Sequence, residues 1–179
     1  PVTKKIAGIL RAVAGTPDPK NFTSVVICAA GSSTRMEKLM GEPRKQFMEL
    51  DGLPVVARTL QAFEAADTVH EIIVVAREDE LPLYEGFKEK YGLSKLIKVV
   101  KGGATRQESA RLGSDEVDER CKFVAVADAA RCLTTPEEIQ RVCHAAYQYS
   151  AASAGVKATD TVKVCDKSAF IESTPDRNY

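Results

Sequence analysis

Four short apolar runs along the chain predict strands that are buried on both faces. They cover residues 24–30, 71–76, 97–100 and 123–127 and are rich in valine, isoleucine and alanine. Runs this short suit strands better than helices, because buried strands commonly have about four to eight residues. Segments with apolar residues at helical spacing separate them. This alternation predicts an α/β fold with a mostly parallel, twisted, doubly wound sheet flanked by helices.

Helices are predicted where apolar stripes coincide with start or stop signals. A proline or a capping threonine opens two of these segments, and a glycine, which tolerates left-handed dihedral angles, closes another. Residues 105–115 form a further, weakly patterned helical segment. The stripes are Val56, Leu60 and Phe63 after Pro54; Leu83, Phe87 and Tyr91 before Gly92; and Ile139, Val142, Cys143 and Ala146 after Thr135-Pro136-Glu137-Glu138.

The two ends of the chain carry other patterns. Residues 1–20 are predicted to be a helical extension, because a short amphipathic stretch there runs into two prolines, which cannot continue a helix. The main domain is expected to cover residues 21–179. From Ala151 onward, short β-rich pieces such as 161–164 replace the helical pattern, and no internal repeat is present.

Composition narrows the class of protein. The chain has 179 residues, of which 44% are hydrophobic and 28% charged, as in a soluble globular domain with its own core. The 25 basic residues balance the 25 acidic ones, which argues against a nucleic-acid partner, since proteins that coat nucleic acid carry a cationic surplus. No apolar run approaches the roughly 20 residues that span a bilayer, so no membrane segment is expected.

The cysteines and histidines bear on the compartment and on metal chemistry. The five cysteines are odd in number and form no C-x-x-C pair, which fits a reducing compartment better than a disulfide framework. A cytoplasmic location is therefore expected. The chain has two histidines, too few to favour a zinc site.

Candidate chemistry should follow the predicted strands, because ligands of doubly wound folds bind beyond the carboxyl ends of the strands. After the first run, Ala29-Ala30-Gly31-Ser32-Ser33-Thr34-Arg35-Met36 offers closely spaced backbone N–H groups and an arginine, which suit a polyphosphate. The loop lacks the P-loop and dinucleotide-binding glycine patterns, so neither an ATPase nor a dehydrogenase follows from it. A surface turn without a ligand would have the same composition.

Three further segments extend this pattern. Lys45, in Pro43-Arg44-Lys45-Gln46-Phe47, could reach the same phosphates, although a solvated basic loop is the simpler interpretation of an isolated Arg-Lys pair. Gly102 and Gly103 permit close backbone approach, but such a turn needs no ligand. Asp128 and Arg131 flank two alanines directly after an apolar strand, where a merely exposed ion pair is less expected. Together, these loops predict a nucleotide on one half of the sheet and an acceptor on the other.

In their order and spacing, these motifs resemble the cytidylyltransferase family that makes 4-diphosphocytidyl-2-C-methyl-D-erythritol in non-mevalonate isoprenoid biosynthesis. The resemblance extends from about residue 24 to the end of the chain. The first motif alone would also fit other sugar-nucleotide transferases, so the assignment depends on the whole set. The shared motifs are A-A-G-x-x-x-R-M at 29–36, P-x-K-Q-F at 43–47, G-G-x-x-R-Q-x-S at 102–109, D-A-A-R at 128–131, T-D-T-V-K at 159–163 and D-R at 176–177.

The resemblance implies a Rossmann-like nucleotidyltransferase fold with a C-terminal β-arm at about 157–179. It implies an enzyme in which the phosphate of 2-C-methyl-D-erythritol 4-phosphate attacks the α-phosphorus of CTP and pyrophosphate leaves. Catalysis would come from in-line positioning and from cations, with Mg²⁺ held mainly through the triphosphate and Asp128 as a further candidate ligand. The arm would be exchanged between the subunits of a homodimer and complete the neighbour's acceptor site.

Site residues follow from the same match, motif by motif. Arg35 and Lys45 would be catalytic and would stabilise the pentavalent phosphorus. Asp128 would accept hydroxyl hydrogen bonds or assist the metal, and Arg131 would hold phosphate. The residues expected to bind the nucleotide are Ala29, Ala30, Gly31, Gly103, Ser109 and Ala129, and those expected to bind the acceptor are Asp128, Arg131, Thr161 and Arg177.

The sequence departs from the family pattern in several places. Ser33, Ala127 and Cys132 stand where the family usually has glycine, histidine and proline, and the segment that precedes Lys45 is longer than usual. Family members also continue past the D-R motif with further strands, helices and a late lysine, whereas this sequence ends at residue 179. A polypeptide that ended there is expected to bind CTP poorly and to turn over slowly.

Two other functions share part of the pattern. A CTP-dependent transferase for another polyol phosphate, such as ribitol 5-phosphate, has the same fold and mechanism, but the paired alanines Ala129-Ala130 favour methylerythritol phosphate. A non-catalytic nucleotide-binding module on the same sheet is disfavoured because Arg35, Lys45 and Asp128 are all present. Pyrophosphate release with CTP and each polyol phosphate distinguishes these functions.

Overall fold

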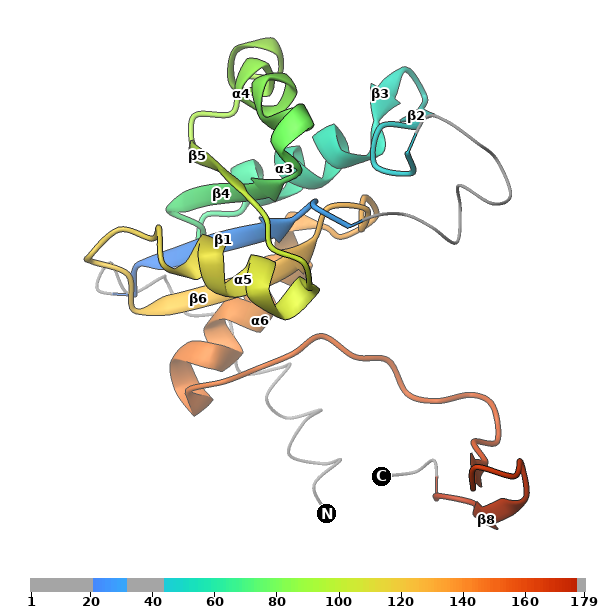
Figure 1. Ribbon diagram of the computed structural model, residues 1–179. Coiled ribbons are helices and arrows are strands. Elements are labelled where there is room, and N and C mark those ends of the chain that lie inside the picture. The colour runs from blue at the N-terminus through green and yellow to red at the C-terminus, as the bar shows by residue number, and fades with distance from the viewer. Residues whose placement is uncertain (1–20, 32–43, 177–179) are drawn as a thin grey trace.

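The computed structural model describes residues 21–31 and 44–176. The helical extension predicted at 1–20 lies outside these residues, as do Arg35 and Arg177. Within the described part, a central sheet with helices on both faces forms the main body, and a small hairpin near the carboxyl end lies apart from it (Figure 1).

Four parallel strands form the central sheet, in the order β5-β4-β1-β6. They confirm the strands predicted from the four apolar runs. The chain moves from β1 to one side of the sheet and later returns to the other side, so its connections reverse beside β1. A reversal of this kind opens a crevice at the carboxyl ends of the strands. The strands are β1 (Thr23–Cys28), β4 (Glu71–Ala76), β5 (Leu96–Lys101) and β6 (Phe123–Asp128).

Three α-helices cover one face of the sheet and enclose the main core. They are α3 (Val55–Ala65), α4 (Leu81–Lys90), which follows the short 3-10 helix η1 (Glu78–Glu80), and α6 (Pro136–Tyr149). Alternate residues of the two central strands share a cluster with side chains of these helices, as the period of two along a strand requires. The cluster includes Val25, Ile27, Ile72 and Val74 from the sheet and Leu60, Tyr84 and Ile139 from the helices.

The starts of α3 and α6 are as predicted. Pro54 immediately precedes α3. Thr135 and Glu138 form a capping box, in which each side chain accepts a hydrogen bond from the other's backbone N–H. These local signals fix where the two helices begin, independently of the tertiary packing.

Helix α5 (Arg106–Ser114) lies over the opposite face, in front of the strands in Figure 1. Its backbone approaches the sheet closely at Gly113, where an added Cβ would lie 2.4 Å from Val26 Cγ1 and 2.6 Å from Val75 Cγ2. Thr105 caps the helix, and its Oγ1 accepts a hydrogen bond from the backbone N–H of Glu108 at 3.0 Å. The start of α5 is thereby held at the carboxyl edge of the sheet.

Two burial predictions from the sequence are wrong. Leu83 is 47% exposed and Tyr84 is buried in its place, whereas Phe87 is buried and Tyr91 packs against the core as predicted, so the predicted stripe of α4 is wrong at its first position. The runs that form β5 and β6 are predicted to be buried on both faces, but Ile97 of β5 is 44% exposed and Val124 and Val126 of β6 are 44% and 43% exposed. The reason is that these two strands are the edges of the described sheet, and β6 also lies beyond the strands that α5 covers.

Two small hairpins complete the described structure. Strands β2 (Glu49–Leu50) and β3 (Leu53–Pro54) are joined by Asp51-Gly52, whose φ values of 53° and 74° give the left-handed turn that suits a two-residue hairpin. Strands β7 (Val164–Cys165) and β8 (Ile171–Ser173) pair within the predicted arm. In the parts of the chain that the structure describes, no helix has the length and apolar character needed to cross a bilayer.

The close approach of α5 predicts that Gly113→Ala destabilises the fold. The added methyl group would collide with Val26 and Val75, and overpacking of this kind costs about 1–3 kcal/mol in the free energy of unfolding. Urea unfolding measures the change. Gly86→Ala in α4 is the matched control, because nothing outside its helix lies within 4 Å of the added Cβ. The control should gain about 0.5–1 kcal/mol, so equal effects would contradict the packing of α5.

Candidate functional site

The carboxyl ends of the central strands meet at one edge of the sheet. Cys28, the last residue of β1, lies beside Asp128 of β6 on one side and Val75 of β4 on the other. The loops that follow these strands therefore start next to one another. This confirms that the sequence motifs after the strands are gathered in space.

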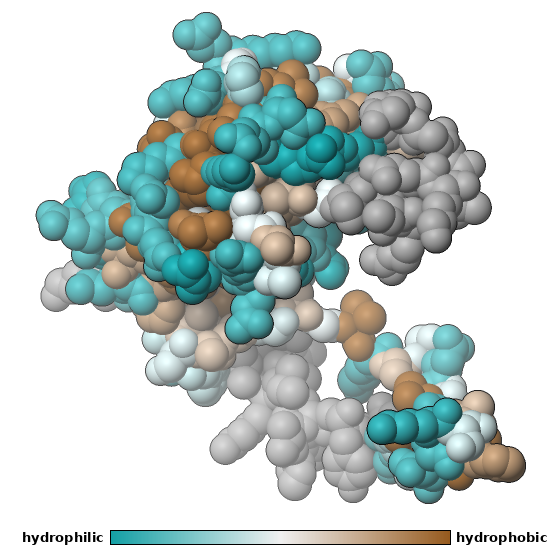
Figure 2. All heavy atoms as spheres, viewed as in Figure 1, coloured by the Kyte–Doolittle hydropathy of each residue, from teal (hydrophilic) through white to brown (hydrophobic). Residues whose placement is uncertain are grey.

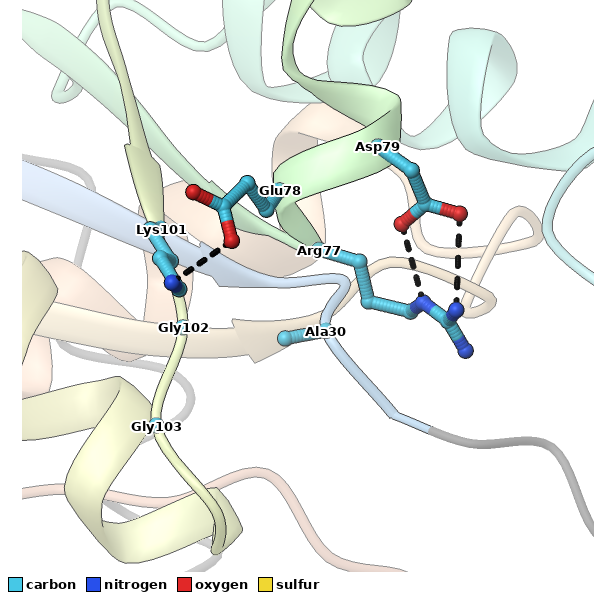
Figure 3. Close-up of a pocket in the computed structure, with 7 residues that line it drawn as sticks. All are labelled: Ala30, Arg77, Glu78, Asp79, Lys101, Gly102 and Gly103. Carbon is cyan, nitrogen blue, oxygen red and sulfur yellow. Dashed lines mark hydrogen bonds and ion pairs between the residues drawn. The ribbon is translucent and has the colours of Figure 1, made fainter.

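A cavity of about 570 Å³ opens at this edge. Its volume lies within the range of small-molecule sites, roughly 300–1,000 Å³. Figure 3 shows the loops after β1, β4 and β5 around it, with charged side chains at the mouth and glycines along one wall. The lining residues are Ala30, Arg77, Glu78, Asp79, Lys101, Gly102 and Gly103.

The glycine wall depends on contact between two of the predicted motifs. A Cβ on Gly102 would lie 2.4 Å from Cβ of Ala30, so only glycine permits this approach. The backbone N–H of Gly103 donates to Oγ of Ser109 at 3.1 Å, and Ser109 is buried. The structure thus brings Ala30, Gly103 and Ser109 together, and the serine holds the glycine turn in place.

Ala29 and Ala129 form the floor beneath the loops. The N–H of Ala29 donates to the carbonyl of Val75 at 2.7 Å, and the N–H of Ala129 donates to the carbonyl of Cys28 at 3.2 Å. The hydroxyl of Thr59 donates to the carbonyl of Ala129 at 2.8 Å. Both alanines are buried, so they shape the site through the backbone. Gly31, two residues after Ala29, is exposed.

Asp128 is held between two arginines. Its Oδ1 accepts from Nε of Arg106 and its Oδ2 from Nε of Arg131, both at 3.0 Å. Burial raises the pKa of Asp128, but these hydrogen bonds outweigh it and hold the pKa below the ordinary carboxyl value. The carboxylate is therefore ionised at neutral pH, and any ligand that reaches it competes with two guanidinium groups.

The mouth of the cavity carries two more ion pairs, which the sequence analysis missed. Nζ of Lys101 lies 2.7 Å from Oε2 of Glu78, and Nε of Arg77 lies 3.1 Å from Oδ1 of Asp79 (Figure 3). The sequence contained a sign of them, because Arg77 directly follows the apolar run at 71–76, just as the other candidate residues follow their apolar runs. The role of Arg106 as a partner of Asp128 was missed as well, since only the fold brings them together.

Lys45 lies in a turn beside the first loop. Its side chain is exposed, and the neighbouring Gln46 donates from Nε2 to the carbonyl of Ala29 at 3.3 Å. The interpretation of this segment as a solvated basic loop is wrong for Arg44, which is only 9% exposed and lies 2.7 Å from Glu80. An isolated pair of cations in the sequence gave no sign that one of them would be buried.

Thr161 is not brought to this edge within one chain. It is exposed within the predicted arm, and this part of the chain lies well apart from the sheet in Figure 1. The other two predicted residues that would complete the set, Arg35 and Arg177, lie outside the described residues. Their roles stay predictions.

The acidic side chains at this edge already have partners, which limits the ligands that they offer to a metal ion. Among the described residues, no group of three or more histidine, cysteine or acidic side chains is placed to bind a metal ion. The acidic side chains at or beside the cavity are Glu78, Asp79, Glu108 and Asp128. Glu78, Asp79 and Asp128 have cationic partners, and Oε2 of Glu108 accepts a hydrogen bond from the backbone N–H of Ala104 at 2.8 Å. A divalent cation would have to displace such a partner to gain a carboxylate ligand here.

Comparisons with known proteins assign the family. Residues 23–179 match the family model described as IspD, 2-C-methyl-D-erythritol 4-phosphate cytidylyltransferase. Proteins of that name are 43% identical over 157 residues in Caldanaerobacter subterraneus and 36% identical over 154 residues in Clostridium botulinum. These alignments cover 87% and 86% of this chain, which spans 68% and 66%, about two thirds, of the length of those relatives.

A solved structure agrees with these relatives. The crystal structure of 4-diphosphocytidyl-2C-methyl-D-erythritol synthase from Anaerococcus prevotii superposes with a TM-score of 0.73 at 26% identity. The superposition covers 89% of this chain and 67% of that one. It confirms the nucleotidyltransferase fold predicted from the sequence.

The two hydrogen bonds to Asp128 predict that Arg106→Gln raises its pKa toward the ordinary carboxyl value, because one cationic donor is lost. NMR titration of the side-chain carboxyl measures this. Since the pKa is depressed in the folded state, this interaction stabilises the fold above the ordinary carboxyl pKa and is lost as the pH falls through the folded-state value. Arg111→Gln on the same helix is the control, because Arg111 pairs with Asp115 at 2.8 Å. An unchanged pKa in the Arg106 variant would refute the assignment.

Proposed function

The chain belongs to the 2-C-methyl-D-erythritol 4-phosphate cytidylyltransferase family, and from this premise we propose that it transfers CMP from CTP to 2-C-methyl-D-erythritol 4-phosphate. The observation that carries the proposal is the family match over residues 23–179, two of whose motifs line one cavity at the switch point of the sheet through Ala30, Gly102 and Gly103. The product would serve isoprenoid precursor biosynthesis by the non-mevalonate route.

The proposed reaction is a displacement at phosphorus. A phosphate oxygen of the acceptor attacks the α-phosphorus of CTP, the bond from that phosphorus to the β-phosphate bridging oxygen breaks, and pyrophosphate leaves with the electron pair. Such transfers need little covalent help from a protein, so positioning and charge stabilisation supply the catalysis. Lys45 and Arg35 are the cations proposed to stabilise the charge that develops on the phosphorus oxygens.

The nucleotide is proposed to occupy the cavity. Ala30 and Gly31 would present backbone N–H groups to the triphosphate, where no side chain intervenes. The wall formed by Gly102 and Gly103 leaves room for the flat face of the base, and Ser109 keeps that wall in place. Hydrogen bonds from this backbone can read the edge of cytosine, which supports a pyrimidine over a bulkier purine.

The acceptor is proposed to bind on the β6 side. Asp128 is ionised and could accept hydrogen bonds from the hydroxyl groups of the polyol, while Arg131, its neighbour, would hold the phosphate. Mg²⁺ would be bound chiefly by the triphosphate with Asp128 as the nearest protein ligand, and it would neutralise charge on the leaving pyrophosphate. Binding there would require Asp128 to exchange at least one of its arginine partners.

A homodimer is proposed because the arm exposes apolar side chains that a single chain leaves in water. Val156 is 98% exposed, Phe170 74% and Ile171 61%. Figure 2 shows hydrophobic atoms at the surface of the segment that extends from the body. Apolar surface of this extent usually marks a protein interface. An arm seated on a second copy would also bring Thr161 and Arg177 to the partner's acceptor site.

We place the enzyme in the cytoplasm. All five cysteines are free thiols in the structure, at positions 28, 121, 132, 143 and 165. Unpaired cysteines in this number suit a reducing compartment. CTP and phosphorylated sugar alcohols are also intracellular metabolites by their charge, since neither crosses a bilayer unaided.

The proposed function predicts pyrophosphate release from CTP with 2-C-methyl-D-erythritol 4-phosphate as the acceptor and none with ribitol 5-phosphate. A coupled pyrophosphate assay on the complete gene product, with Mg²⁺ present, measures both. ATP in place of CTP is the control for base recognition. Release with ribitol 5-phosphate alone would assign the chain to the other polyol, and CTP binding without release would leave a nucleotide-binding module.

The exchanged arm predicts complementation between two inactive variants. Thr161→Ala would impair the site of the partner subunit, whereas Lys45→Met would impair the site of the subunit that carries it. In a dimer of one subunit of each variant, one site would therefore keep both residues intact. Random mixing makes half of the dimers mixed, and about a quarter of the wild-type activity should return. Refolding the two variants together and assaying pyrophosphate release tests this. No recovery beyond the sum of the separate variants would mean that Thr161 does not act across subunits.

A further inference from the structure

The turn at 44–47 places one exposed lysine between two buried polar residues. The backbone N–H of Phe47 donates to the carbonyl of Arg44 at 2.9 Å, which closes the turn. Arg44 and Gln46 are 9% and 3% exposed, whereas Lys45 is exposed. A lysine side chain is long and flexible, so its reach is set by where the turn holds its backbone.

Arg44 is fixed by a charged contact in a poorly hydrated place. Its Nη1 lies 2.7 Å from Oε1 of Glu80, and the two side chains are 10% and 8% exposed. Its Nη2 lies 3.5 Å from Oδ2 of Asp79. Burial raises the pKa of Glu80, whereas the charge of Arg44 opposes that shift. The ion pair therefore connects the turn to η1, at the start of α4.

Stability alone does not explain this pair. Removing two charges from water carries a penalty that their attraction often fails to exceed, and apolar replacements of similar size are commonly neutral or stabilising. The structure supports this expectation locally, because Nη1 of Arg44, despite its short ionic contact, and Oε2 of Glu80 are both buried without a hydrogen bond among the described residues. An ion pair under such conditions is better explained by the geometry that it imposes.

The turn has three further attachments, of which the one to Ala29 lies at the site. Gln46 donates to the carbonyl of Ala29 at 3.3 Å and accepts from the N–H of Val56 at 2.9 Å through its own carbonyl. The ring of Phe47 lies 5.6 Å from that of Tyr84, centroid to centroid. The Arg44 contact adds η1, so the turn is held against the loop after β1, α3, α4 and η1 at once.

We propose that the ion pair between Arg44 and Glu80 is a positioning device for Lys45, which fixes the turn so that the lysine reaches the reacting phosphates. This inference rests on the proposed function, because it needs Lys45 to act on the nucleotide. Neither Arg44 nor Glu80 touches the substrate in this arrangement. Both act through the backbone of the turn.

The deciding variant replaces both charges, R44M/E80M, so that no unpaired charge stays buried. We expect its unfolding midpoint in urea to match that of the unaltered protein. We expect kcat for pyrophosphate release to fall between about tenfold and a hundredfold, because a displaced catalytic group loses rate. The KM for CTP should change by less than about threefold, since Lys45 is expected to act mainly in the transition state.

The matched control is K98M/E116M, which removes an exposed ion pair of 3.0 Å away from the cavity and should leave kcat unchanged. Combining R44M/E80M with K45M shows through which residue the pair acts. If it acts through Lys45, the triple variant is no slower than K45M alone. If the losses of kcat from R44M/E80M and from K45M multiply in the triple variant, the inference is overturned. A folded R44M/E80M variant with unaltered kcat would also overturn it.

Failure of the proposed function gives a different result. In that case K45M itself retains kcat, whatever the Arg44 and Glu80 variants do. If R44M/E80M does not fold, Arg44→Lys decides, because it keeps the charge but lacks the planar fork that can engage Glu80 and Asp79 together. We then expect at least about a threefold loss of kcat in R44K, and unaltered turnover in that variant would refute the positioning role.

Discussion

The parallel pairing of β1 with a strand on each side is the constraint on which the site depends. Cys28 ends β1 beside Asp128 and beside Val75, so three loops begin from one edge although they are about 50 residues apart in the chain. The chain adds strands first on one side of β1 and later on the other, so the connections diverge beside β1 and leave a crevice there. Without that register, the motifs would be unrelated surface loops.

Packing on both faces keeps this edge in place. The core on the α3 side is continuous across β1 and β4, which fixes the strands relative to one another. On the other face, Gly113 lets α5 lie directly on Val26 and Val75. The start of that helix carries Thr105 and Arg106 to the same edge, so the sheet, and not a flexible loop, positions the partner of Asp128.

The sequence allowed the strands, the helix starts and the grouping of motifs to be predicted, because these depend on local signals. Short β-branched runs and the capping box at Thr135 act within a few residues and need no knowledge of the fold. What was missed depends on contacts between distant segments. The burial of Arg44, the exposure of Val124 and the pairing of Arg106 with Asp128 are each set by a neighbour that the sequence does not place.

The charges at the cavity mouth have a consequence for inhibitor design. Every charged side chain that lines the cavity already has an oppositely charged neighbour, as Arg77 has Asp79 and Lys101 has Glu78. A compound with a single charged group must separate one of these pairs before it gains a new contact. A neutral heterocycle that hydrogen-bonds to the glycine backbone avoids this loss, and is the better starting chemistry for a selective drug.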